Sequence, residues 1–152
     1  MKNRGIIYLG ADHAGYELKK KIKMFLGERG IQHVDMGGIG EVTDDYPDFA
    51  LKVCKKVAKD ANARGVLICG TGIGMCIVAN KVDGIRAAFV CDEFSAKMSR
   101  MHNDANVICL RSRDFSDEEN IKLVNMWLST SFSREERHQR RIDKIKKIER
   151  NN

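Results

Sequence analysis

Residues 65–74 read Gly-Val-Leu-Ile-Cys-Gly-Thr-Gly-Ile-Gly, an apolar run followed directly by a glycine-rich turn. A run of Val, Leu and Ile is typical of a strand that is buried on both faces of a parallel sheet. Glycines after such a strand allow the chain to turn tightly. The stretch therefore predicts a strand over residues 65–69, a turn over 70–74 and a helix over 75–81, the repeating unit of α/β folds.

The same alternation extends outward from this stretch in both directions. Further apolar runs predict strands at residues 5–10, 31–35, 85–91 and 106–110. Apolar residues at helical spacing predict helices after these strands, at residues 18–30, 47–61, 94–101, 117–128 and about 134–148.

The predicted fold class is α/β. We expect a three-layer α/β/α, Rossmann-like domain with a five-stranded parallel sheet, plus a basic C-terminal helix at about 134–148. Right-handed crossovers and the strand order 2-1-3-4-5 are the expected topology. No linker or low-complexity segment divides the chain, so residues 1–152 are predicted to form a single domain.

Composition argues against several classes of protein. The apolar runs are far shorter than the ~20 residues of a membrane span, so no membrane association is expected. Five cysteines without any Cys-x-x-Cys pair favour free thiols in a reducing cytoplasm, with no metal site. The net charge of +6 concentrates near the C-terminus, where acidic residues intervene and no aromatic residue follows Phe132. This pattern argues against nucleic acid and fits a small anionic ligand.

The predicted topology brings two polar segments together. Asp12 and His13 follow the first strand, and Cys69 begins the glycine-rich turn after the third strand. Ligands of open α/β sheets bind beyond the carboxyl ends of the strands, at the point where the strand order reverses. We therefore expect an acid, an imidazole, a thiol and a glycine-rich helix start to line one crevice.

The glycine-rich turn favours anion binding. Its backbone N–H groups can hold a phosphate or an oxyanion that develops during a reaction. The Gly-x-Gly-x-Gly spacing is not that of dinucleotide-binding folds, and a purely structural turn is the alternative. Cys69 is either a small core residue or a reactive thiol, because a helix N-terminus stabilises a thiolate.

Basic side chains supply further candidates. His13 and His102 could donate a proton or bind phosphate, or could be ordinary surface groups. Arg113 follows the fifth strand on the side of the crevice, and Arg137 and Arg141 share one face of the last helix. Guanidinium groups suit phosphate, although each arginine could equally be a solvated charge.

Further motifs extend over nearly the whole chain: Gly10-Ala11-Asp12-His13, Asp45-Tyr46-Pro47, Ile68-Cys69-Gly70-Thr71-Gly72-Ile73-Gly74, Ala79-Asn80-Lys81, Gly84-Ile85-Arg86-Ala87, Ser99-Arg100, His102-Asn103-Asp104-Ala105-Asn106-Val107 and Arg137-His138-Gln139. In this combination the chain resembles the type B ribose-5-phosphate isomerases and their galactose-6-phosphate and allose-6-phosphate isomerase relatives. Each motif alone is weak, but together they are specific.

The resemblance implies a role for each catalytic candidate. Cys69 would be the base that takes the proton beside the carbonyl carbon. His102 would donate a proton to help open the sugar ring, with Asp12 near the ring hydroxyls and Thr71 assisting. The backbone nest for the enediolate oxygen would consist of Gly70, Thr71, Gly72, Ile73 and Gly74.

The resemblance also implies the remaining contacts and the assembly. Asn103 matches a position that binds the sugar. The positions that handle the phosphate are His13, Arg113, Arg137 and Arg141. Family members are homodimers or dimers of dimers whose active sites are built from two subunits, and they require no metal or other cofactor.

Two departures from the family pattern affect the phosphate site. Glu135-Glu136 stand where two glycines are usual, which bears on where Arg137 and Arg141 lie. Arg111 replaces a usual glycine and adds a positive charge near the expected phosphate.

The sequence therefore predicts a metal-independent aldose–ketose isomerase. The expected reaction interconverts ribose 5-phosphate and ribulose 5-phosphate through a cis-enediolate. One alternative is an isomerase of a hexose 6-phosphate, allose or galactose. The other is a non-catalytic module that binds a sugar phosphate or nucleotide.

Overall fold

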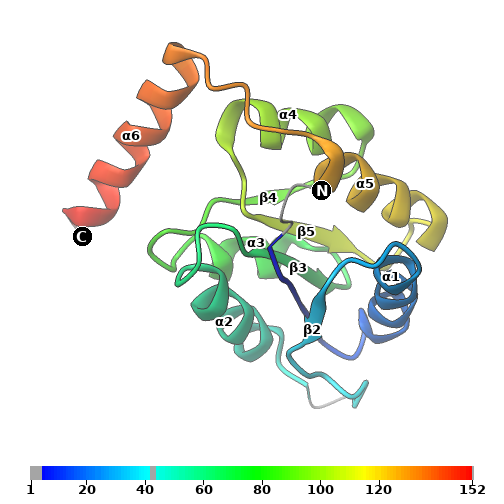
Figure 1. Cartoon of the computed structure of the whole chain (residues 1–152). Coiled ribbons are helices and arrows are strands. Elements are labelled where there is room, and N and C mark those ends of the chain that lie inside the picture. The colour runs from blue at the N-terminus through cyan, green and yellow to red at the C-terminus, as the bar shows by residue number, and fades with distance from the viewer. Residues whose placement is uncertain (1–4, 42–43, 152) are drawn as a thin grey trace.

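The computed structural model describes residues 5–41 and 44–151 and has the predicted three-layer α/β/α architecture (Figure 1). Its strands form one parallel sheet: β1 (Ile7–Ala11), β2 (His33–Asp35), β3 (Arg64–Cys69), β4 (Ala87–Phe89) and β5 (Val107–Arg111). Its helices are α1 (Tyr16–Glu28), α2 (Tyr46–Val57), α3 (Ile73–Ala79), α4 (Glu93–Asn103), α5 (Asp117–Ser129) and α6 (Glu136–Arg150). The predicted fold class is confirmed.

Different helices cover the two faces of the sheet. On one face α1, α4 and α5 pack around a core that includes the fully buried Leu9 and Trp127. On the other face α2 and α3 pack around Leu67 and Met75. Successive residues of β3 contribute to opposite cores, which explains its unbroken apolar sequence.

The strand order is β2-β1-β3-β5-β4, so the predicted order 2-1-3-4-5 is wrong for the last two strands. β5 pairs with β3, and β4 lies at the edge of the sheet. The chain moves outward from β3 to β4 through α3 and returns to β5 through α4 on the opposite face. Two crossovers of the same hand that run in opposite directions place their helices on opposite faces, as α3 and α4 lie here.

Burial explains why β5 takes the inner position. Four of its five residues are buried, whereas β4 is reduced to three half-buried residues. The outer edge of β4 is closed by a side chain: the Asn80 amide donates to the Ala87 carbonyl and accepts from the Ala87 N–H, both at 2.9 Å. Such a cap prevents an edge strand from pairing with another chain.

Helix boundaries differ from the predictions at two functionally relevant places. The Asp92 side chain accepts from Ser95 N (2.6 Å) and begins α4, which runs on to residue 103. His102 and Asn103 therefore lie in the last turn of α4 and not in a loop after it. The last helix begins at Glu136 because Arg134 has a φ of 59°, outside the helical region.

A buried lysine holds the loop after β2 over the end of β1. Lys19 is 1% exposed, and its Nζ donates to Asp35 Oδ1 (2.8 Å) and to the carbonyls of Gly37 (2.6 Å) and Gly38 (2.8 Å). Gly38 has a φ of +90°, and a Cβ there would lie 2.0 Å from the Ala11 carbonyl oxygen. The loop thus sits directly on the backbone that leads to Asp12.

Replacing Lys19 with Met should lower the free energy of unfolding by about 2–4 kcal/mol, because Asp35 and two carbonyls lose a buried partner. Lys23→Met is the matched control: its Nζ contacts the same carboxylate at 2.8 Å but is more exposed, so the expected loss is below about 1 kcal/mol. Urea unfolding at neutral pH measures both. Equal losses would contradict this account of Lys19.

The stability difference should also depend on pH. Burial acts to raise the pKa of Asp35, but hydrogen bonds from Lys19 and Lys23 outweigh it and hold this pKa below the ordinary 3.8. The stabilisation is therefore present above that value and is lost as the pH falls through the lowered pKa.

Candidate active site

Asp12 lies buried at the carboxyl end of β1. Its Oδ1 accepts hydrogen bonds from the backbone N–H groups of Ala14 (3.0 Å) and Gly15 (3.2 Å), and its own N–H donates to the Ile68 carbonyl (3.3 Å). Gly15 is required at this point, because a Cβ there would lie 2.7 Å from the Ile68 carbonyl oxygen. The start of α1 is therefore pressed against β3, which brings the Asp12 turn beside the end of that strand.

Cys69 is the last residue of β3 and is only 4% exposed. Its Sγ accepts a hydrogen bond from the Gly72 N–H at 3.1 Å. Its carbonyl accepts from both the N–H (3.0 Å) and the Oγ (3.2 Å) of Ser112. The thiol is thus fixed from both sides, with the backbone of the glycine-rich turn directed at the sulfur. Sequence reasoning overlooked Ser112.

The glycine-rich turn has the form of an anion nest. Gly72 has a φ of +75°, and a Cβ there would meet the Phe89 ring at 2.9 Å. A Cβ on Gly74 would lie 2.6 Å from the Tyr46 ring, so only glycine allows Tyr46 to cover the turn. Thr71 is exposed, and its Oγ1 accepts from the N–H of Ile73 at 3.3 Å.

Three basic residues lie near this edge of the sheet. The Arg113 guanidinium lies over Gly70, 3.1 Å from where a Cβ would be, and the Arg113 N–H donates to the Gly70 carbonyl (3.1 Å). His13 Nδ1 is buried and has no hydrogen-bond partner within the described residues. Arg111 packs over the Phe115 ring at 4.8 Å, so its side chain lies against the segment that leads to α5.

His102 and Asn103 lie far from Cys69 within one chain. α4 begins beyond the carboxyl end of β4 and spans 11 residues, about 16 Å, so its last turn lies toward the amino edge of the sheet. Arg86, which precedes β4, donates from Nε to the Asn103 carbonyl at 2.8 Å and confirms this position. The structure therefore brings Asp12 and Cys69 together but does not bring His102 to them.

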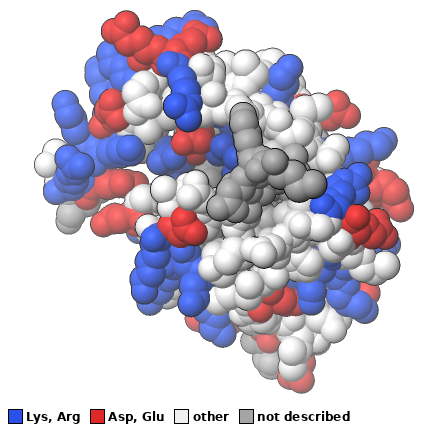
Figure 2. Space-filling model, in the orientation of Figure 1, with Lys and Arg blue, Asp and Glu red and all other residues white. Residues whose placement is uncertain are grey.

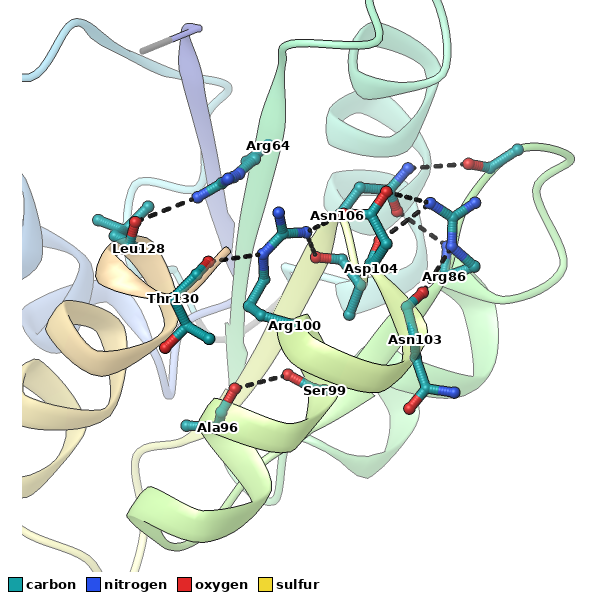
Figure 3. A network of polar contacts seen from close by, with 12 residues as sticks. Arg64, Arg86, Ala96, Ser99, Arg100, Asn103, Asp104, Asn106, Leu128 and Thr130 are labelled. Atoms are coloured by element: carbon teal, nitrogen blue, oxygen red, sulfur yellow. Dashed lines mark hydrogen bonds and ion pairs between the residues drawn. The ribbon is translucent and has the colours of Figure 1, made fainter. Parts of the chain in front are cut away.

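A polar network fixes the end of α4 (Figure 3). Arg100 is 5% exposed; its Nη1 contacts Asp104 Oδ1 (2.9 Å) and donates to the Ala105 carbonyl (2.6 Å). Arg86 Nη2 contacts the other oxygen of Asp104 at 3.3 Å. Asp104 adopts a φ of 45° and ends the helix. Two arginines that share one carboxylate thus set the orientation of the turn that carries His102.

The start of α6 joins this second group. His138 is 2% exposed, its Nδ1 lies 2.6 Å from Ser133 Oγ, and its ring centroid lies 4.3 Å from that of His102. Burial is the main cause that lowers the pKa of His138, and the neighbouring His102 adds to it.

Arg137 and Arg141, the predicted phosphate-binding arginines of α6, are exposed. Arg137 donates from Nε to Glu135 Oε2 at 2.8 Å, and this bond lowers the pKa of Glu135. Arg141 lies one turn further along the same face of the helix. α6 itself stands apart from the sheet, and acidic side chains intersperse its basic ones (Figures 1 and 2).

The other cysteines differ from Cys69 in their surroundings. Burial raises the pKa of Cys54 to about 12 and that of Cys109 well above its ordinary value. A hydrogen bond with Cys109 is the main cause that lowers the pKa of Cys76 to about 7. Within residues 5–41 and 44–151, no three His, Cys, Asp or Glu side chains are grouped to hold a metal ion. No helix in these ranges is long and apolar enough to span a membrane.

Comparison with known proteins agrees with this geometry. The family described as Ribose/Galactose Isomerase matches residues 7–145. A probable ribose-5-phosphate isomerase B from Mycoplasma genitalium is 48% identical over 145 residues, which cover 94% of this chain and 95% of that protein.

Solved structures agree as well. Ribose-5-phosphate isomerase B from Mycoplasma genitalium with bound ribulose-5-phosphate superimposes with a TM-score of 0.93 at 46% identity, covering 97% of each chain. The Clostridium thermocellum enzyme gives a TM-score of 0.92 at 44% identity, covering 97% of this chain and 99% of that one. With its sequence matched over residues 7–145 and its fold shared at this level, the chain belongs to the ribose/galactose isomerase family.

Proposed function

We propose that this protein interconverts ribose 5-phosphate and ribulose 5-phosphate, with Cys69 as the base. The observation that carries the proposal is the Cys69 thiol, buried and held by the Gly72 N–H at the edge of a backbone nest, beside the Asp12 turn. The relatives named ribose-5-phosphate isomerase B, one of them crystallised with ribulose-5-phosphate, support the choice of a five-carbon substrate.

The proton transfer follows from this arrangement. The Cys69 thiolate removes the proton from C2 of the open aldose, and the electron pair forms the C1–C2 double bond while O1 becomes an oxyanion. The N–H groups of the turn stabilise that oxyanion. Thr71, exposed at the mouth of the nest, is placed to move the hydroxyl proton between O2 and O1. Cys69 then returns its proton to C1, and the ketose forms.

Ring opening comes first, because the cyclic aldose hides its carbonyl. His102 is the proposed proton donor to the ring oxygen, and Asp12 the group that faces the ring hydroxyls. His13 and Arg113, whose guanidinium lies over Gly70, are the proposed phosphate ligands on the Cys69 side. Arg137, Arg141 and Asn103 complete the phosphate and sugar contacts from the α4–α6 side.

A second copy of this chain completes the proposed site, as a homodimer or a dimer of dimers. The supporting observation is that, within one chain, Cys69 lies at the carboxyl ends of the strands and His102 lies toward their amino ends. Ile73 (54% exposed) and Ile77 (56%) present an apolar face of α3 directly beside the nest. A groove of about 620 Å³, lined by Asn103 and by α6 residues, offers further surface for a partner subunit.

A hexose 6-phosphate is the second candidate substrate, because the matched family includes galactose isomerases. Turnover of allose or galactose 6-phosphate above that of ribose 5-phosphate would favour it. Tight sugar-phosphate binding without any turnover would instead favour a non-catalytic binding module. We place the reaction in the cytoplasm without a metal cofactor; the cysteines, all of them free thiols, support a reducing compartment.

Replacing Cys69 with Ala should lower ribose 5-phosphate turnover by about 10²–10⁴-fold, because it removes the base proposed to move the carbon-bound proton. It should also stop the exchange of the C1 hydrogen of ribulose 5-phosphate with D₂O, followed by NMR. Substrate binding, measured by calorimetry, should persist.

The matched control is Cys91→Ala, which removes an exposed thiol and should leave turnover unchanged. The parent should keep its activity in a chelator. Unchanged turnover in Cys69→Ala would refute the assignment of the base.

Replacing Glu135 with Gln should lower the KM for ribose 5-phosphate by about two- to fivefold, at constant kcat. Glu135 holds Arg137 in an exposed ion pair at 2.8 Å, which substrate phosphate must displace, and exposed pairs of this kind are weak. Steady-state kinetics at low salt measures the effect. Glu136→Gln serves as the control, and an increased KM in Glu135→Gln would contradict a role for Arg137 in phosphate binding.

A further inference from the structure

Ser133 links the segment before α6 to the turn that carries His102. Its N–H donates to the Met101 carbonyl at 3.1 Å, one residue before His102. Its Oγ lies 2.6 Å from His138 Nδ1 and also accepts from the Glu135 N–H at 3.3 Å. The His138 ring in turn lies against the His102 ring, with centroids 4.3 Å apart and planes inclined by 36°. These contacts link the last turn of α4 to the start of α6 at two points, through the Met101 carbonyl and through the His102 ring.

The two imidazoles in these contacts have different surroundings. His138 is 2% exposed, whereas His102 is half-buried and can reach a ligand. His138 faces His102 from α4, and Glu135, Arg137 and Arg141 from its own segment. Burial, with smaller contributions from His102, Arg137 and Arg141, outweighs Glu135 and lowers the pKa of His138, which favours a neutral ring at pH 7. A neutral, buried ring does not compete with His102 as an acid.

We propose that His138, held by Ser133, is a positioning residue that fixes the ring of His102 for proton donation to the sugar ring oxygen. The inference rests on the proposed function and extends it to two residues without an assigned role. An imidazole on the last turn of a helix rotates about two side-chain torsions, and an aromatic neighbour at 4.3 Å restricts both. A hydrogen bond to one ring nitrogen fixes the orientation of that neighbour.

Two substrates distinguish a misplaced His102 ring from general structural damage, because only one of them must be ring-opened. Ribose 5-phosphate is a ring until it is opened, so its turnover requires the acid. Ribulose 5-phosphate cannot close through O5, because that oxygen carries the phosphate, so the exchange of its C1 hydrogen requires only Cys69 and the nest. A defect confined to His102 must therefore slow ribose 5-phosphate turnover and spare the exchange.

The experiment compares Ser133→Ala and His138→Phe with the parent, with turnover and C1 exchange in D₂O measured on the same preparations. We expect kcat for ribose 5-phosphate to fall about tenfold in both variants, with KM nearly unchanged and C1 exchange within about twofold of the parent. Ser133→Thr, which keeps a hydroxyl, should restore most of the turnover. The control is Gln139→Ala, whose side chain donates to Asp143 Oδ1 at 2.9 Å within α6, and it should match the parent.

Each other outcome overturns the inference. Equal losses of turnover and exchange in both variants would show a structural role, and unchanged turnover in both would show no role. Failure of Ser133→Thr to recover activity would exclude the hydroxyl as the holding group. A parent that shows neither turnover nor exchange would contradict the proposed function itself, which distinguishes that failure from the others.

Discussion

The pairing of β3 with β1 on one side and with β5 on the other is the constraint on which the rest of the structure depends. It places Cys69 at the carboxyl end of the central strand, between Asp12 and Arg113. Because all strands are parallel, the residues that follow them meet at the same end of the sheet, beyond the carboxyl ends of the strands. The helices run antiparallel to the strands. A residue in the last turn of a helix, such as His102, therefore lies near the amino ends of the strands, away from Cys69. The same topology thus assembles the nest and separates it from His102.

Most of the fold could be predicted from the sequence because its strongest signals are local. The apolar run of β3 and the helical periodicities depend only on which side chains are buried, and they located most of the elements to within a few residues. The order of β4 and β5 depends on which of the two strands pairs better with β3, and the local sequence pattern of each strand does not contain that information. The run at 85–91 is apolar enough for an inner strand, yet Asn80 caps it as an edge, and that bond joins residues from different elements.

The candidate site was predictable in part for the same reason. Asp12, Cys69 and the turn after it are adjacent to predicted strand ends, so topology alone brought them together. The helix predicted over 94–101 placed His102 in the loop that follows. In the structure α4 continues to Asn103, where the Asp104 network ends it, so His102 lies in its last turn, toward the amino ends of the strands. Ser112 and Ser133 act through backbone and ring contacts that have no sequence signature. The Glu135 substitution was visible in the sequence, but its pairing with Arg137 required coordinates.

We propose that each active site combines Cys69 of one subunit with His102 of another. The most direct measurement mixes two inactive variants, Cys69→Ala and His102→Asn, after joint unfolding and refolding. If two-fold symmetric dimers form at random, half are mixed and each mixed dimer holds one intact site, so about a quarter of the parent activity should return. Mixed dimers that form but recover no activity would contradict the claim.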